Sequence, residues 1–120
     1  MLINLSNNPS TYWESVQLEE AKNSYGRIID IPFPIISPTS ELKEVEQLAK
    51  DYLERIKSII EFSKDTNNAV HIMGEQTFTF VLLCKLKALN IKAVSSTTVK
   101  VQDKNLISSK SEFVFFREYY

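Results

Sequence analysis

Short apolar stretches alternate with longer amphipathic stretches along this chain. The first three apolar stretches have the length of buried strands, and they end at a serine, a proline and a glycine. In the amphipathic stretches, apolar residues recur every three or four positions, the spacing of one helix face. The predicted strands cover residues 1–5, 27–31, 69–73 and 91–95, the last continuing through 97–101. The predicted helices run from about 12 to 24, from about 40 to 63 and from about 76 to 89.

The order of these elements predicts the fold. Strands that alternate with helices form a mostly parallel sheet with helices on both faces, joined by right-handed crossovers. After the fourth strand, Asp103-Lys104-Asn105 is typical of a turn, and residues 111–119 are expected to return as an antiparallel strand. We therefore predict an α/β fold, a Rossmann-like three-layer sandwich with a mostly parallel sheet and a C-terminal antiparallel β-hairpin. It forms a single domain over residues 1–120.

Capping residues are expected at the starts of the first two helices. Ser10 or Thr11 is placed to cap the first helix, with Glu14 in the capping-box position three residues beyond Thr11. Thr39 or Ser40 is placed to cap the second helix, after a loop interrupted by prolines.

The junction at Gly74 is the most informative segment, because an apolar strand there leads directly into a helix. In open parallel sheets, ligands bind where strands end and helices begin. A helix start offers unpaired N–H groups and a positive dipole end, which suit an anion such as phosphate. Gly74 is one of only two glycines, and a missing Cβ allows close backbone approach. A simple turn explains Gly74 equally well, and a favourable helix dipole explains Glu75 as well as a catalytic role does.

Polar residues follow the first, third and fourth predicted strands. Because the carboxyl ends of parallel strands meet at one edge of a sheet, we expect these residues to share a pocket. Their hydroxyl and amide groups suit phosphate or ribose oxygens and base edges. The alternative is ordinary loop chemistry without a shared pocket. The candidate ligand-binding residues are Ser6, Asn7, Asn8, Gly74, Glu75, Gln76, Thr77, Ser96 and Thr98.

Composition narrows the classes of partner. The net charge of −1 argues against broad binding to duplex nucleic acid. A single cysteine, Cys84, excludes a disulfide framework, and we expect it to be buried in a helix. The N-terminus lacks the pattern of a signal peptide, and no apolar run has the length of a membrane span. We therefore expect a cytoplasmic protein that does not insert into a membrane.

The only histidine, His71, lies on the third predicted strand. There it is better explained as a satisfied core histidine than as a base or a ligand. No cysteine, second histidine or carboxylate lies at metal-ligand spacing from it, so no metal site is predicted. Aromatic residues near the C-terminus could stack on bases, but they are better explained by packing of the hairpin. They are Phe113, Phe115, Phe116, Tyr119 and Tyr120.

Several segments together resemble a known family. They are Leu5-Ser6-Asn7-x-Pro9, Met73-Gly74-Glu75-x-Thr77-Phe78, Asn90-Ile91, Ser96-Thr97-Thr98 and the last strand from Phe113 to Tyr119. This combination resembles the small CRISPR-associated ring nucleases of type III systems, which are single-domain relatives of the CRISPR-associated Rossmann fold. The resemblance spans both ends of the chain.

The resemblance implies a homodimer that binds cyclic oligoadenylate, usually the four-membered ring, across its two-fold axis. It implies cleavage without metal or cofactor, in which a ribose 2′-hydroxyl attacks the adjacent phosphate and leaves a 2′,3′-cyclic phosphate. The expected catalytic residues are Lys100, which would neutralise transition-state charge, and Thr97.

Three positions depart from the family pattern. Asn8 stands where relatives often carry His, Val99-Lys100 where they carry a charged pair ending in Arg, and Phe115 where they carry Arg. Each change removes a cation or a proton-transfer group. Two alternatives therefore stay open: a non-catalytic binder that sequesters or senses the messenger, and an interaction domain without a nucleotide ligand.

Overall fold

The computed structural model describes residues 1–102 and 109–120, so the predicted turn at Asp103-Lys104-Asn105 lies outside the described residues. The strands are β1 (Leu2–Ser6), β2 (Ile28–Pro32), β3 (Ala69–Met73), β4 (Lys92–Gln102) and β5 (Ser109–Glu118). The helices are the 3-10 turn η1 (Ser10–Tyr12), α1 (Ser15–Tyr25), α2 (Leu42–Ser63) and α3 (Gln76–Ala88). The predicted elements are all present, with ends that differ by a few residues.

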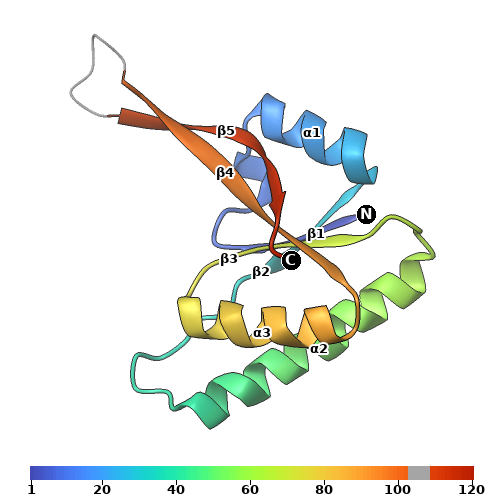
Figure 1. The fold of residues 1–120 in the computed structure, drawn as a ribbon, viewed down its shortest axis with the longest axis vertical. Helices are drawn as coiled ribbons and strands as arrows, with labels where there is room; N and C mark the ends of the chain where they lie inside the picture. The colour runs from blue at the N-terminus through green and yellow to red at the C-terminus, as the bar shows by residue number, and fades with distance from the viewer. Residues whose placement is uncertain (103–108) are drawn as a thin grey trace.

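The sheet lies between α1 on one face and α2 with α3 on the other (Figure 1). Its strand order is β2-β1-β3-β4-β5, with β5 antiparallel to β4 and the other pairs parallel. The predicted three-layer α/β sandwich with a C-terminal hairpin is therefore confirmed. No helix in the described part of the chain is both long and apolar enough to cross a membrane.

Strand alternation divides the core into two layers. Ile3 on β1 and Val70 on β3 face α2 and α3, where they pack with Phe78. Leu2 and Ala69 face α1 and belong to a smaller cluster around Trp13. The face toward α1 also carries the polar residues of these strands, and this determines where a site can form.

The starts of α1 and α2 differ from the sequence prediction. The N-cap of α1 is Glu14, whose side chain makes no hydrogen bond to the helix. Ser10 does not cap the helix, and its hydroxyl donates to Asp30 at 2.6 Å. The N-cap of α2 is Glu41, which forms a capping box with Glu44. Glutamate side chains thus stand where serine or threonine was expected. Cys84 is exposed on α3, so its predicted burial was wrong.

The strand order creates a switch point between β1 and β3. From β1 the chain crosses over α1 to β2 on one side, and it then returns through α2 to β3 on the other side. Loops that leave neighbouring strands in opposite directions open a crevice at their carboxyl ends, the usual ligand position in such sheets.

A two-stranded ribbon borders this crevice. β3 pairs with β4 only where Ala69–His71 meets Lys92–Val94. Beyond Val94, β4 pairs with β5 alone among the described strands, and the pair extends away from α2 and α3 and past α1 (Figure 1). A register shift between Ser96 and Thr98 bends this ribbon.

Gly74 is explained by packing. A Cβ at this position would collide with the ring of Phe33, which stacks edge-on against Phe78 at 5.3 Å. Gly26 is the only described glycine with a positive φ, so Gly74 has a backbone that any residue adopts. The close approach that the sequence suggested at Gly74 is therefore made by an aromatic side chain of the protein.

We expect Gly74→Ala to destabilise the protein by about 1–3 kcal/mol, because Phe33 must move out of its place in the core. Urea unfolding measures the change. In a Phe33→Leu background the same substitution should cost much less, since the smaller side chain leaves room. An equal cost in both backgrounds would show that the ring is not the obstacle.

Candidate functional site

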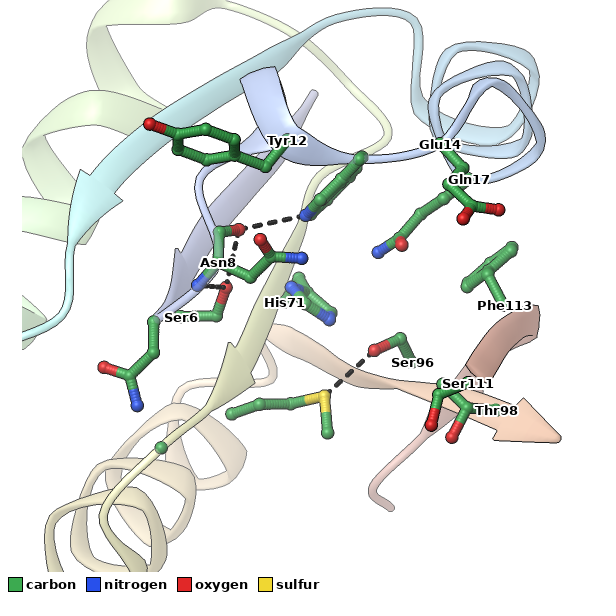
Figure 2. A pocket seen from close by; sticks show the side chains of 14 residues that line it. Ser6, Asn8, Tyr12, Glu14, Gln17, His71, Ser96, Thr98, Ser111 and Phe113 are labelled. Carbon is green, nitrogen blue, oxygen red and sulfur yellow. Dashed lines mark hydrogen bonds between the residues drawn. The ribbon is translucent and has the colours of Figure 1, made fainter. Parts of the chain in front are cut away.

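A pocket of about 450 Å³ opens at the switch point, and we call it the switch-point pocket. It confirms the expected meeting of three strand ends. Six of the predicted ligand-binding residues line it: Ser6, Asn7, Asn8, Gly74, Ser96 and Thr98. Further lining residues come from the segment around η1 and α1, from β3 and from β5: Tyr12, Trp13, Glu14, Gln17, His71, Met73, Ser111 and Phe113. Figure 2 shows His71 between the side chains of the β1 loop and those of β4 and β5.

The start of α3 does not contribute the expected anion cradle. Glu75 folds back and accepts from the amide of Thr77 at 3.0 Å and from that of Phe78 at 2.8 Å. These bonds hold the pKa of the Glu75 carboxyl below its ordinary value. Glu75 and Thr77 face a different hollow, between α3 and the loop before α2, and Gln76 lies beside Phe80. The prediction that these amides bind phosphate is therefore corrected, because a carboxylate of the protein already occupies them.

The two residues predicted to be catalytic, Thr97 and Lys100, are absent from the pocket lining. The Thr97 hydroxyl bridges the register shift, donating to the carbonyl of Phe115 at 3.1 Å and accepting from its amide at 3.2 Å. Lys100 is exposed further along the ribbon, opposite Ser111. The structure thus places both residues outside the group that lines the pocket.

Three polar side chains form a row across three neighbouring strands, β2, β1 and β3. Asp30 on β2, Asn4 on β1 and His71 on β3 occupy matching register positions. The Asn4 Nδ2 donates to Asp30 Oδ1 at 2.8 Å, and the His71 Nδ1 lies 2.8 Å from Asn4 Oδ1. Asn4 and His71 are almost fully buried, at 1% and 2% exposure. We call these residues the polar row.

The hydrogen bonds of the polar row fix the protons of His71. Asn4 Nδ2 faces two acceptors, Asp30 Oδ1 and the carbonyl of Asn8, so the Asn4 oxygen must face His71. A carbonyl oxygen only accepts, so Nδ1 of His71 carries the proton. In the neutral ring Nε2 is then an acceptor.

Nε2 of His71 is buried and has no hydrogen-bond partner among the described residues. Leaving such a group unpaired costs about 1–3 kcal/mol. Trp13 packs edge-on against the ring at 5.4 Å and Phe116 at 5.5 Å. Burial in these surroundings lowers the pKa of His71 from 6.5 to about 4. The expectation of a satisfied core histidine therefore holds for one ring nitrogen and fails for the other.

The loop after β1 is anchored to the same row. The carbonyl of Asn8 accepts from Asn4 Nδ2 at 3.0 Å and from the Trp13 indole at 2.9 Å. Both lone pairs of that carbonyl are thus in use, so the Ser6 hydroxyl donates to Asn4 Oδ1 at 2.8 Å. Ser6 lies in the pocket wall as a support for the loop, which leaves the side chains of Asn7 and Asn8 for a ligand.

Charge in the pocket is sparse. Among its lining residues, Glu14 is the only carboxylate, and none is lysine or arginine. Glu14 accepts an ion pair from Lys110 on β5 at 2.9 Å. That contact raises the pKa of Lys110, although both side chains are exposed. The Asp30 carboxylate does not line the pocket and belongs to an exposed residue at the β2 end of the polar row. Burial acts to raise its pKa, but hydrogen bonds from Ser10 and Asn4 outweigh burial and keep it low.

Sequence reasoning missed Asn4 and Asp30. The available signal was one polar residue in the third position of each of three short strands, Leu2–Ser6, Ile28–Pro32 and Ala69–Met73. Parallel strands in simple register place such residues side by side. In residues 1–102 and 109–120, no three His, Cys, Asp or Glu side chains group closely enough to hold a metal ion.

A family model described as the uncharacterized protein MJ1673 family matches residues 1–117. Because the match covers nearly the whole chain, the protein belongs to this family. Neither a curated protein nor a solved structure matches it. The family description names no ligand or reaction, so a function must come from the chemistry of the pocket.

We expect nitrogen NMR of the single histidine to show a proton on Nδ1 and none on Nε2 at pH 7, because Asn4 offers only an oxygen. The ring should take up a second proton near pH 4. A titration followed by nitrogen shifts measures both properties. The opposite tautomer, or a pKa near 6.5, would contradict the assignment.

Burial of His71 should also make stability depend on pH. Its folded pKa lies below its unfolded value of 6.5, so the unfolded chain takes up the proton first as the pH falls. Stability is therefore full above pH 6.5 and declines toward pH 4 by roughly 3 kcal/mol. Urea unfolding of wild type and His71→Gln over this range isolates the effect. Equal pH dependence of the two proteins would contradict it.

Proposed function

We propose that this member of the MJ1673 family binds a cyclic oligoadenylate in the switch-point pocket and opens the ring without a metal ion. In a cytoplasm with type III CRISPR defence, that reaction would switch off the messenger. One observation supports the proposal above others: a pocket of neutral hydroxyl and amide groups contains a buried imidazole with one unpaired acceptor. The resemblance to ring nucleases supplies the ligand class.

The lining chemistry suits an adenosine unit. Amides of Asn7, Asn8 and Gln17 offer both donors and acceptors, as the edges of adenine and the ribose hydroxyls require. The exposed ring of Tyr12 and the ring of Phe113 provide flat apolar surfaces on which a base stacks. Hydroxyls of Ser96, Thr98 and Ser111 suit phosphate oxygens.

The size of the pocket supports the proposal of a homodimer. A volume of about 450 Å³ lies at the lower end of ligand pockets and accommodates about one nucleotide. A ring of four nucleotides therefore needs a second pocket opposite the first. Two copies related by a two-fold axis provide it, and a symmetric ring matches a symmetric site.

Cleavage would use the 2′-hydroxyl of the ligand itself as the nucleophile. The protein needs to align that oxygen with the phosphorus and the departing 5′-oxygen, and to accommodate charge on the phosphate. Lys110 at the rim is the cation for this purpose once a phosphate displaces Glu14. Hydroxyls of Ser96 and Thr98 add uncharged donors.

A second candidate is a binder that sequesters or senses the messenger without cleaving it. Two observations favour it. Glu75 occupies the amides of Thr77 and Phe78 that would stabilise phosphate charge. The pocket lining contains no lysine or arginine, while Glu14 adds a negative charge.

We expect purified protein to convert cyclic tetra-adenylate in EDTA to a linear product with a 2′,3′-cyclic phosphate end. Chromatography of single-turnover samples resolves the ring from the product, and calorimetry measures binding. Binding with an intact ring after prolonged incubation would favour the sequestering function. The absence of binding to any cyclic or linear oligoadenylate would favour an interaction domain and would contradict the nucleotide proposal.

Glu14→Gln should tighten binding of the anionic ring several-fold at low salt, because it removes repulsion and releases Lys110. The gain should shrink as salt rises. Glu19→Gln, at an exposed position on α1, is the matched control and should change affinity little. Equal affinities of wild type and Glu14→Gln would show that the ligand does not approach this rim.

A further inference from the structure

At one end of the polar row, which we call the closed end, the carboxylate has hydrogen-bond partners. At the other end, the open end, one ring nitrogen has no partner among the described residues. At the closed end, Asp30 accepts from Asn4, from the Ser10 amide at 3.0 Å and from the Ser10 hydroxyl. At the open end, Nε2 of His71 has no partner in the described part of the chain. A purely structural polar cluster is normally satisfied at both ends. His71 lines the switch-point pocket, and its Nε2 is buried at the pocket wall.

The row also holds the imidazole in one orientation. The amide of Asn4 is locked by its bonds to Asp30 and Asn8, and its oxygen then selects the Nδ1–H form of His71. Trp13 and Phe116 pack edge-on against the ring. A base in a catalytic site needs a fixed tautomer, a fixed direction and a nearby carboxylate that favours the protonated form. Asp30 provides that carboxylate through Asn4.

We propose that His71 is the catalytic base of this pocket, that Nε2 takes the proton of a ribose 2′-hydroxyl, and that Asn4 and Asp30 are positioning residues. This inference rests on the proposed function. As the proton moves to Nε2, the 2′-oxygen bonds to phosphorus and the bond from phosphorus to the 5′-oxygen breaks. The 5′-oxygen takes a proton from water, and the imidazolium returns its proton to solvent. The linear product is an isomer of the ring, so the atoms balance.

The charged groups around His71 determine how the reaction depends on pH. Asp30 acts from β2, and Glu14 lies at the start of α1, paired with Lys110 of β5. Glu118 of β5 occupies the same register row and pairs with Lys92 at 3.5 Å. The carboxylates and the bound phosphates favour the protonated imidazole. The cleavage rate should therefore rise with pH to a plateau once Nε2 is free of its proton.

The test is single-turnover cleavage of cyclic tetra-adenylate in EDTA across pH 4 to 8, with calorimetry for binding. His71→Gln should slow cleavage by about 10²- to 10⁴-fold and abolish the acidic limb, while affinity stays within a few-fold. Added imidazole should partly restore cleavage by His71→Ala, which a packing role would not allow. Cleavage by His71→Gln within about three-fold of wild type, with the same pH profile, would overturn the inference and leave the proposed function intact.

Asp30→Asn is the second variant, because it keeps the size of the side chain and one oxygen that can accept from Asn4 and from the Ser10 amide, while it removes the charge. We expect a loss of roughly 10- to 100-fold in rate and a shift of the acidic limb to lower pH, since the imidazolium loses its negative neighbour. Asp51→Asn, at an exposed position on α2, is the matched control. An unchanged limb in Asp30→Asn would remove Asp30 from the mechanism.

The behaviour of the wild type distinguishes the two levels of the proposal. If wild type binds the ring without opening it, the catalytic role of His71 is overturned while the binding function remains. If wild type neither binds nor cleaves, both proposals fall together.

Discussion

The side-chain amide of Asn4 is the interaction on which the functional edge of this protein depends. It is buried on β1, between β2 and β3, and makes four hydrogen bonds, two through nitrogen and two through oxygen. These bonds join the carboxylate on β2, the loop after β1 and the imidazole on β3. In a low-dielectric interior, a fully bonded amide of this kind allows only one arrangement of its partners. The geometry of the pocket thus follows from one residue outside its lining.

The second constraint is the near absence of charge inside the pocket. Many phosphate sites use the first turn of a helix, but here Glu75 closes that turn from within. The remaining groups are amides, hydroxyls and aromatic rings, which read shape and hydrogen-bond pattern. Such a lining offers little charge to a free phosphate, and its one imidazole has a buried nitrogen without a partner among the described residues.

The fold was predictable from the sequence because its signals are local. Apolar runs and helical spacing identified the five strands and the three α-helices of the described residues but not η1, and the alternation of strands and helices implied that the loops after β1, β3 and β4 would meet. The features that could not be predicted from the sequence depend on contacts between distant residues or on side-chain rotamers. Phe33 fills the space beside Gly74, Glu75 turns back on its own helix, and Thr97 bridges a register shift.

The unpaired nitrogen of His71 was not predicted, for a different reason. A histidine in an apolar strand reads as a core residue when it is considered alone. Asn4 and Asp30 occupy matching positions on the neighbouring strands. This match can be recognised only when the order of the strands and their register are known. A search for polar residues at the same depth of neighbouring strands would have found the row.

The two-stranded ribbon gives the pocket one rigid wall and one compliant wall. β1 and β3 lie between helical layers, whereas Ser96, Thr98, Ser111 and Phe113 lie on the part of the ribbon beyond Val94, where β4 and β5 pair only with each other among the described strands. Phe116 anchors the base of the ribbon to Trp13 and His71, and beyond that anchor a two-stranded ribbon bends more easily than a sheet covered by helices. We therefore expect substitutions on the ribbon well outside the pocket to change the width of the pocket opening. A ligand that contacts both walls should make the whole ribbon more rigid.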